Sequence, residues 1–210
     1  ELKARFDEDN NIQWAKQLEQ AGIHVVYGII GFKTHTKIAL IVRKEKGRLR
    51  NYFHIGTGNY NSNTSKFYTD LGLLSTDPEI ASDLLELFNY LSGFSKQKSY
   101  QKLLVSPSSM RKKFIFLIKR EIKNAEEGKK AEIIAKMNSL VDPEIINLLY
   151  LASDSGVKIS LIVRGICCLY PQRKNLSENI KVKSIIGHFL EHSRIFWFCN
   201  NGDNEVFIGS

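Results

Sequence analysis

Two histidine-containing segments, one in each half of the chain, combine residue types that suit chemistry on phosphate. His35 is followed two positions later by Lys37, and His192 is followed two positions later by Arg194. Each pair precedes a β-like run, and side chains two positions apart on an extended backbone project to the same side. A neutral imidazole nitrogen can attack phosphorus, while an adjacent cation neutralises charge on the phosphoryl oxygens. The spacing therefore predicts nucleophilic catalysis on a phosphate.

Each pair is followed by a predicted hairpin and then by a glycine next to a hydroxyl residue. The first half carries Gly56-Thr57-Gly58-Asn59, and the second half carries Gly209-Ser210. Glycine allows backbone amides to approach a phosphate closely, and an asparagine adds an amide side chain. A lone histidine at a strand end is most often structural, but recurrence in both halves favours function. One histidine would attack, and the other would protonate the leaving oxygen.

Short β-like runs alternate with amphipathic helices, a pattern that predicts an α/β fold. The expected helices span 9–21, 77–93, 110–127 and 143–153. The second of these helices begins at Asp77, a good N-cap residue, followed by Pro78. The expected strands span 1–6, 23–27, 37–42, 51–55, 131–135, 157–163, 194–199 and 205–208. The polar, basic stretch at 95–100 marks the junction between the two halves.

The composition sets broad limits on function. Of the 210 residues, 43% are hydrophobic and 25% are charged, and the formal net charge is +8. Such a chain is typical of globular proteins, and its charge favours a polyanionic partner without choosing among nucleic acid, phosphorylated metabolites and inorganic polyanions. No apolar run approaches the roughly 20 residues that cross a bilayer. The three cysteines include no C-x-x-C pair, so we expect reduced, buried thiols in a cytoplasmic protein.

The paired motif resembles that of the phospholipase D superfamily, which has His-x-Lys, four residues, Asp, and then Gly-Ser-x-Asn. Val42 stands where that aspartate is expected, and Arg194 replaces the second lysine. These departures weigh against a phosphodiesterase and fit the polyphosphate kinase branch, which the chain resembles almost end to end. The similar stretches span 2–8, 22–27, 33–35, 54–60, 68–70, 136–142, 161–167 and 189–194.

The resemblance implies two phospholipase D-like α/β domains, each a mixed β-sheet flanked by helices, with the active site in a basic groove between them. Residues 1–98 would form the first domain, and residues 99–210 would form the second, truncated at its C-terminus. The implied activity is reversible transfer of the γ-phosphate of ATP to the end of an inorganic polyphosphate chain, through a phosphohistidine and with Mg²⁺. The resemblance also implies a homo-oligomer in the full-length protein, no nucleic-acid partner, and a location in the cytoplasm or at the inner membrane.

The resemblance also assigns roles to individual residues. His35 matches the histidine that becomes phosphorylated, and His192 matches the second active-site histidine, a candidate general acid. Tyr68, Arg164 and His192 match positions that contact the nucleotide. Arg5 matches a position associated with Mg²⁺. Because arginine has no lone pair for a metal, we expect Arg5 to bind the phosphates that the metal bridges.

The remaining motif residues and one departure complete the prediction. Lys37, Asn59 and Arg194 are expected to bind substrate near the transferred phosphate. His188 stands where the family usually carries arginine, which would weaken a phosphate contact, supply it only at lower pH, or be a surface change. Two alternatives stay open: a phosphodiesterase or transferase of the phospholipase D superfamily, and a non-catalytic polyanion-binding fragment.

Overall fold

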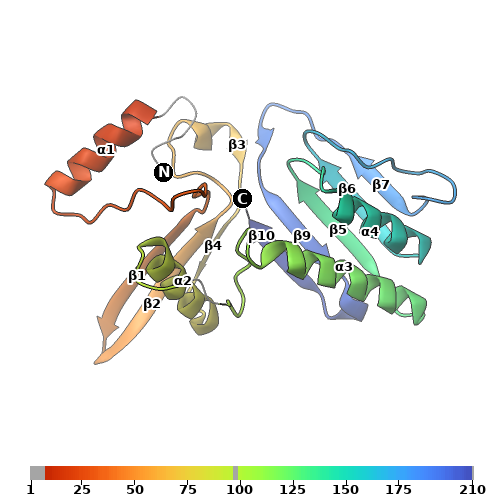
Figure 1. Cartoon of the computed structure of the whole chain (residues 1–210), viewed down its shortest axis with the longest axis horizontal. Coiled ribbons are helices and arrows are strands. Elements are labelled where there is room, and N and C mark those ends of the chain that lie inside the picture. Colours follow the sequence, from red (N-terminus) through yellow and green to blue (C-terminus); the bar gives the residue numbers. More distant parts are fainter. Residues whose placement is uncertain (1–7, 97–98, 210) are drawn as a thin grey trace. The chain divides into compact units, whose positions relative to one another are not determined.

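The computed structural model describes residues 8–96 and 99–209, which divide into two compact units (Figure 1). The first unit combines the chain up to Phe53 with Ser75–Leu103. The second combines His54–Leu74 with the chain from Leu104 onward. The domain boundary at residues 98 and 99 stays a prediction, and the grouping of residues 54–74 with the second half was not foreseen in the sequence.

The first unit contains a β-hairpin and two helices. The helices are α1 (Glu8–Gln20) and α2 (Pro78–Leu91), and the hairpin strands are β1 (Ile38–Glu45) and β2 (Arg48–Gly56). Lys46 and Gly47 link the strands with φ angles of 47° and 80°, as a two-residue hairpin turn requires. Asp77 caps α2 as predicted, because its side chain accepts hydrogen bonds from the backbone N–H groups of Glu79 and Ile80. The strand order of the sheet is β1-β2-β4, in which the end of β2 and most of β4 (Gly72–Ser75) are grouped with the second unit.

The strand expected at residues 23–27 is wrong, because this segment follows α1 without forming a strand. The backbone N–H of Ile23 donates to the carbonyl oxygen of Leu18 at 3.0 Å and so closes the end of the helix. The hydroxyl of Tyr27 donates to Glu19 at 2.5 Å, which holds the segment against the same helix. Residues with high β propensity form a strand only where a neighbouring strand pairs with them, and here the segment contacts the end of α1 instead. The strand expected at residues 1–6 lies outside the described residues.

The second unit contains a five-stranded sheet with the order β10-β9-β5-β6-β7. Its strands are β5 (Glu132–Met137), β6 (Lys158–Val163), β7 (Ile180–Lys183), β9 (Arg194–Phe198) and β10 (Glu205–Gly209). β5, β6 and β7 run parallel, whereas β9 is antiparallel to both β5 and β10. The mixed sheet confirms the predicted fold class. The sequence did not predict β7, β4 or the two-residue strands β3 (Tyr68–Thr69) and β8 (Leu190–Glu191).

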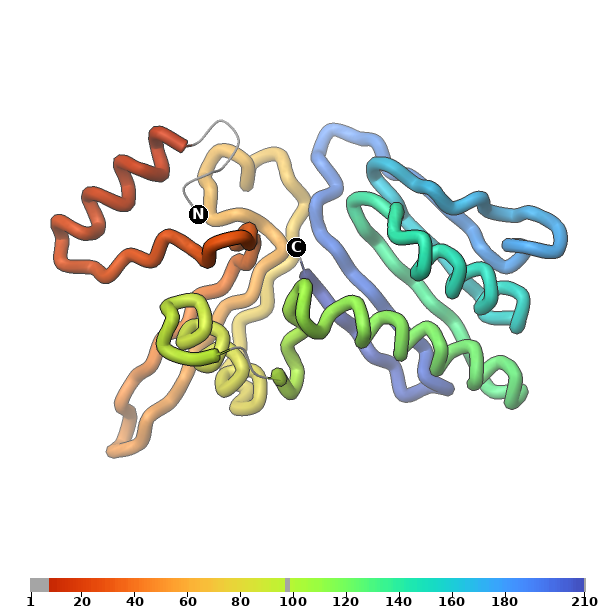
Figure 2. Tube along the Cα trace, in the orientation of Figure 1, coloured from red at the N-terminus to blue at the C-terminus, as the bar shows by residue number. Residues whose placement is uncertain are grey.

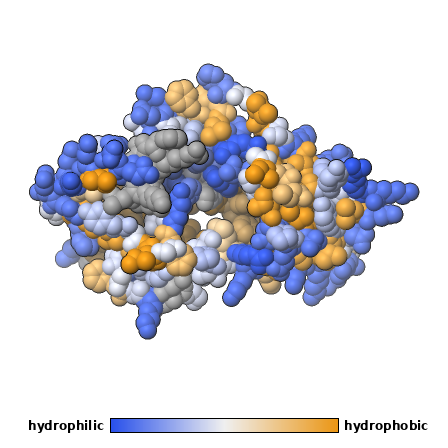
Figure 3. All heavy atoms as spheres, turned by 45° about the horizontal axis from the view of Figure 1, so that its top comes forward, coloured by the Kyte–Doolittle hydropathy of each residue, from blue (hydrophilic) through white to orange (hydrophobic). Residues whose placement is uncertain are grey.

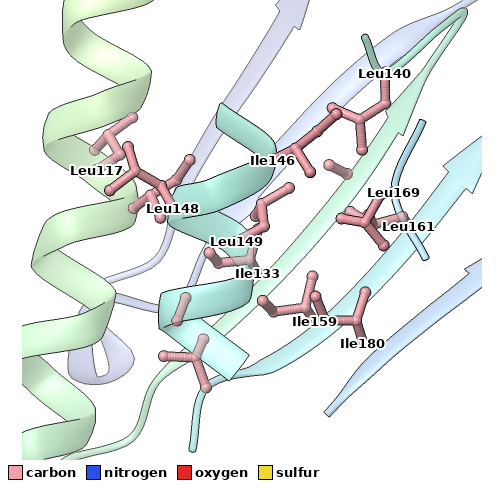
Figure 4. Close-up of a cluster of buried hydrophobic side chains, with 14 of the residues drawn as sticks. Leu117, Ile133, Leu140, Ile146, Leu148, Leu149, Ile159, Leu161, Leu169 and Ile180 are labelled. Carbon is pink, nitrogen blue, oxygen red and sulfur yellow. The ribbon is translucent and has the colours of Figure 1, made fainter. Parts of the chain in front are cut away.

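Helices α3 (Met110–Glu126) and α4 (Pro143–Asp154) pack together and supply the core of the second unit with the sheet (Figure 4). Leu117 of α3, Leu149 of α4 and the β6 residues Ile159 and Leu161 are almost fully buried in one hydrophobic cluster. Such burial of aliphatic side chains contributes roughly 1.5–3 kcal/mol for each residue. The amphipathic pattern of α3 is confirmed by this arrangement.

Two of the residues that the sequence analysis singled out, Arg164 and Arg194, lie at the same end of the strands of this sheet. The parallel strands β5 and β6 end together, since Met137 pairs with Val163. β9 runs in the opposite direction, so its first residue, Arg194, lies toward the same edge, where Arg164 follows β6. The carboxyl ends of parallel strands are a common place for ligands to bind in α/β proteins.

The face shown in Figure 3 carries hydrophilic side chains together with patches of apolar side chains. Within residues 8–96 and 99–209, no helix is long and apolar enough to span a membrane. Cys199 is buried and Cys167 is half-buried, but Cys168 is exposed. The expectation of buried thiols is therefore wrong for Cys168.

Candidate functional site

A parallel pairing in the second unit brings two distant segments together. Tyr68 pairs with Leu190, and Thr69 pairs with Glu191, so β3 and β8 lie side by side (Figure 2). The backbone N–H of Ser193 continues the contact by donating to the carbonyl oxygen of Thr69 at 3.0 Å. Residues 68–70 are therefore held directly against residues 190–193, which include His192.

His192 is held by a carboxylate at the end of this pairing. Its Nδ1 lies 2.7 Å from Oδ1 of Asp70, and the residue is only 7% exposed. An ionised carboxylate only accepts hydrogen bonds, so the contact places a proton on Nδ1 and leaves Nε2 for chemistry. The ring of Tyr68 lies against the imidazole, with centroids 4.8 Å apart and planes tilted by 36°. The imidazole is thus fixed in both orientation and tautomer.

Asp70 is positioned in turn by the glycine-rich segment that follows β2. The hydroxyl of Thr57, which is fully buried, donates to Oδ1 of Asp70 at 2.7 Å. A Cβ atom at Gly58 would lie only 2.5 Å from Oδ2 of Asp70, so the carboxylate fits because this residue is glycine. The sequence predicted a phosphate-approaching role for this segment, and its contact with a carboxylate was not foreseen.

Two arginines anchor on the backbone beside His192. Arg194 donates from Nη1 to the carbonyl oxygen of His192 at 2.7 Å, and Arg164 donates from Nη1 to that of Glu191 at 3.1 Å. Burial lowers the pKa of Arg194, the nearby Arg164 lowers it further, and Asp70 acts in the opposite direction. Within the part of the chain that the structure describes, neither guanidinium forms a salt bridge with a carboxylate. Two close, partly desolvated guanidiniums of this kind suit a phosphate anion.

The first unit holds the other histidine beside a lysine. The ammonium of Lys37 lies 2.9 Å from Nδ1 and 3.3 Å from Nε2 of His35, and it also donates to the carbonyl oxygen of His35 at 2.7 Å. His35 is exposed, whereas Lys37 is 6% exposed. An ammonium can only donate, so this contact favours a neutral imidazole with a lone pair. The two side chains lie together, as their spacing predicted.

For the other predicted residues that the structure describes, Asn59 and His188, no hydrogen bond or ring contact with His192 is observed. Asn59 lies in an exposed turn after β2 in the second unit. His188 is exposed and packs edge-on against the ring of Phe189, with centroids 4.9 Å apart. Arg5 lies outside the described residues.

Sequence analysis missed the carboxylate that pairs with His192. Val42, in the position where the superfamily motif has aspartate, is half exposed in β1. Asp70 stands in a stretch already matched to the family, but 122 positions from its histidine. One signal was available in the sequence. The motif contains no carboxylate, so a carboxylate that pairs with His192 has to come from another part of the chain.

Comparison with known proteins places the chain in a family. The model of "Polyphosphate kinase C-terminal domain 1" matches residues 1–97, and that of "Polyphosphate kinase C-terminal domain 2" matches residues 103–210. The chain belongs to the polyphosphate kinase family. The resemblance inferred from the sequence is confirmed by these two matches.

Individual polyphosphate kinases are similar along the whole chain. The polyphosphate kinase of Parasynechococcus marenigrum is 68% identical and that of Synechocystis sp. is 60% identical, each over all 210 residues. The crystal structure of polyphosphate kinase from Porphyromonas gingivalis superposes with a TM-score of 0.87 at 41% identity, covering 98% of this chain and 34% of that one. The chain spans about 30% of the length of the curated relatives.

The described residues do not fit a resident metal site. No group of three or more His, Cys, Asp or Glu side chains among them could hold a metal ion. The nearest carboxylates to the arginines are already engaged, because Asp70 pairs with His192 and Glu191 pairs with Lys136. Mg²⁺ prefers octahedral oxygen ligands and usually binds through few protein carboxylates together with substrate phosphates.

Proposed function

We propose that the full-length protein is a polyphosphate kinase that transfers the γ-phosphate of ATP to the end of a polyphosphate chain through phosphorylated His35. One observation carries most of the weight. Arg164 and Arg194 donate to the carbonyl oxygens of the adjacent residues Glu191 and His192, form no carboxylate salt bridge in the described ranges, and so flank an imidazole held by Asp70. This combination offers an anion site and a proton donor in one place, which phosphoryl transfer requires.

In the first step, a neutral nitrogen of His35 attacks the γ-phosphorus, and the bond from that phosphorus to the β,γ-bridging oxygen breaks to release ADP. Lys37 supports this role, since its ammonium favours the neutral imidazole and neutralises charge on the phosphoryl oxygens. His192 enters this step as an imidazolium whose Nδ1 proton is held by Asp70, and it donates its Nε2 proton to the leaving oxygen. Asp70 stabilises the imidazolium without taking up the proton, by the logic of carboxylate–histidine pairs.

In the second step, an oxygen of the terminal phosphate of polyphosphate attacks the phosphorus on His35. His192 accepts a proton from the incoming group, and the P–N bond breaks to restore the imidazole. Tyr68 and Arg164 contact the nucleotide, and Asn59 and Arg194 bind near the transferred phosphate. Because a phosphohistidine has a high transfer potential, both steps run in either direction.

Magnesium enters this proposal with the nucleotide. The described residues offer no ligand cage, so no step is assigned to a resident ion. Arg5 is proposed to bind the phosphates of the magnesium-bound nucleotide. Homo-oligomer formation and a cytoplasmic or membrane-peripheral location also belong to this proposal.

The decisive experiment incubates the full-length protein with γ-labelled ATP and Mg²⁺ and maps acid-labile, alkali-stable label by peptide. We expect label on His35 that moves into polyphosphate when unlabelled polyphosphate is added. His24, an exposed histidine of the same unit, provides the control, and His24→Ala should label normally. Native elongation by His35→Ala would refute the mechanism, and label on His192 would reverse the two roles.

The paired arginines also favour a second candidate, a polyanion-binding module without turnover. In that case polyphosphate would bind tightly and with strong salt dependence, and binding would survive loss of both His35 and His192. The absence of ATP-dependent label in the same experiment would support this candidate. Release of an alcohol from a diester without ATP would instead indicate a phosphodiesterase.

A further inference from the structure

A lysine to which the sequence analysis assigned no role, Lys136, contacts both sequence neighbours of His192. Lys136, on β5, places its ammonium 2.5 Å from Oε2 of Glu191 and 2.6 Å from the hydroxyl of Ser193. Its side chain is 15% exposed, and that of Glu191 is 20% exposed. Glu191 and Ser193 are the two sequence neighbours of His192, so one ammonium holds the chain on both sides of the imidazole.

The Glu191 carboxylate is held in place by further contacts. Oε2 also accepts a hydrogen bond from the hydroxyl of Thr69 at 3.2 Å, which ties the carboxylate to β3. The hydrogen bond from Lys136 lowers the pKa of Glu191 and outweighs the opposing effect of burial, so the group carries a negative charge near neutral pH. Charge-assisted hydrogen bonds of this kind are short and strong.

The same glutamate stands next to the proposed anion site. Its backbone oxygen accepts from Arg164, and the following residue, His192, accepts from Arg194 through its own carbonyl. The flexible side chain of Glu191 is therefore attached to the backbone at the point where both guanidiniums anchor. A free carboxylate there would be attracted to either arginine and would compete with a bound phosphate.

We propose that Lys136 is a positioning residue that sequesters the Glu191 carboxylate away from Arg164 and Arg194 and so keeps the arginine pair open for phosphate. The inference rests on the proposed function only in assigning phosphate binding to the two arginines. Lys136 adds no net charge to the site, because Glu191 neutralises it. Its contribution is to hold the carboxylate of Glu191 away from Arg164 and Arg194.

This arrangement makes an unusual prediction about a double variant. In Lys136→Met, Glu191 loses its partner and turns toward the arginines, so phosphate binding weakens. In Lys136→Met combined with Glu191→Gln, no carboxylate is left to compete, so binding recovers although both partners are gone. A lysine that binds phosphate directly would give no such recovery.

The experiment measures the affinity of the full-length protein for tripolyphosphate by calorimetry, without ATP. We expect Lys136→Met to bind at least about tenfold more weakly, as for an opposite charge brought against a desolvated cation. The double variant and Lys136→Arg should bind within about threefold of the native protein. Lys181→Met, which removes an exposed lysine of the edge strand β7, should bind like the native protein. The thermal unfolding midpoint of each variant checks that it remains folded.

The outcomes separate this inference from the proposed function. If the native protein fails to bind tripolyphosphate, the proposed function fails and the inference fails with it. If the native protein binds and folded Lys136→Met binds equally well, only the inference is overturned. A double variant that binds as weakly as Lys136→Met also overturns it, because Glu191 is then not the competitor. If Lys136→Met does not fold, Lys136→Gln takes its place, both alone and combined with Glu191→Gln. The same loss and recovery of binding is then required.

Discussion

The two predicted active-site histidines, His35 and His192, stand in opposite electrostatic settings. His35 is exposed and contacts the ammonium of Lys37, whereas His192 is nearly buried and contacts the carboxylate of Asp70. A cation beside an imidazole favours the neutral ring, which has a lone pair for attack. A carboxylate fixes one tautomer and stabilises the imidazolium that forms when the ring accepts a proton. The same residue type is thereby suited to a nucleophile in one unit and to an acid in the other.

The surroundings of the two histidines also differ in how they are built. His35 and Lys37 are neighbours in sequence, so a short extended segment is enough to bring them together. The setting of His192 requires the β3–β8 pairing, the turn after β2 and the edge of the five-stranded sheet. Changes at distant positions should therefore affect His192 more than they affect His35.

The largest effect is expected where the carboxylate itself is changed. Asp70→Asn replaces an acceptor by an amide that can also donate, so the Nδ1 proton of His192 is no longer fixed. We expect the rate of polyphosphate synthesis by the full-length protein to fall by about 10²–10⁴-fold, the range of general acid catalysis. Asp154→Asn, at the exposed end of α4, is the control. A loss of less than about tenfold would remove Asp70 from the mechanism.

A second prediction concerns the glycine against which Asp70 rests. A methyl group at Gly58 would lie 2.5 Å from Oδ2 and 2.9 Å from Cβ of Asp70, so Gly58→Ala must displace the carboxylate. We expect a loss of about 1–3 kcal/mol in the free energy of unfolding, as for other overpacked sites, together with lower activity. Gly187→Ala is the matched control, because no atom lies within 4 Å of its added Cβ. Equal unfolding midpoints for the two variants would show that Asp70 is not confined there.

A smaller effect is expected from the aromatic ring beside His192. Tyr68→Phe keeps the ring contact at a centroid distance of 4.8 Å, whereas Tyr68→Leu removes it. Aromatic pairs contribute about 0.5–1.5 kcal/mol beyond simple burial. We therefore expect the KM for ATP to rise by roughly two- to tenfold in Tyr68→Leu and to change little in Tyr68→Phe. If both variants lose the same affinity, the hydroxyl and not the ring makes the contact.

Local patterns in the sequence predicted much of the fold. The amphipathic spacing of α3 and the Asp-Pro start of α2 depend on nearby residues, and these helices and α4 form where expected. The segment 23–27 has strand-forming residues but no strand, because propensity cannot reveal whether a neighbouring strand is present. The two-residue strands β3 and β8 are too short to leave a periodic pattern.

In the candidate site, too, residues within local motifs were predicted, whereas residues brought in by distant strand pairing were not. Family motifs pointed to His35, His192, Arg164 and Arg194, whose spacing or flanking residues are visible in the chain. Asp70 and Lys136 were missed because their partners are 122 and 55 positions away and depend on strand register. A single sequence gives no direct signal for such pairings, since any of its 22 acidic residues could have supplied the carboxylate.

The smallest effect expected is on the pH dependence of stability beside His192. The hydrogen bond from Lys136 lowers the pKa of Glu191 below its ordinary value of 4.5. The ionised form is therefore favoured in the folded state, so this contribution is fully present above about pH 4.5 and is lost as the pH falls through the folded-state pKa. Glu191→Gln should destabilise the full-length protein at pH 7, and the difference from the native protein should shrink as the pH is lowered from 5 toward 3. Urea unfolding midpoints at several pH values measure this, and a difference that stays constant would show that the ion pair does not contribute to stability.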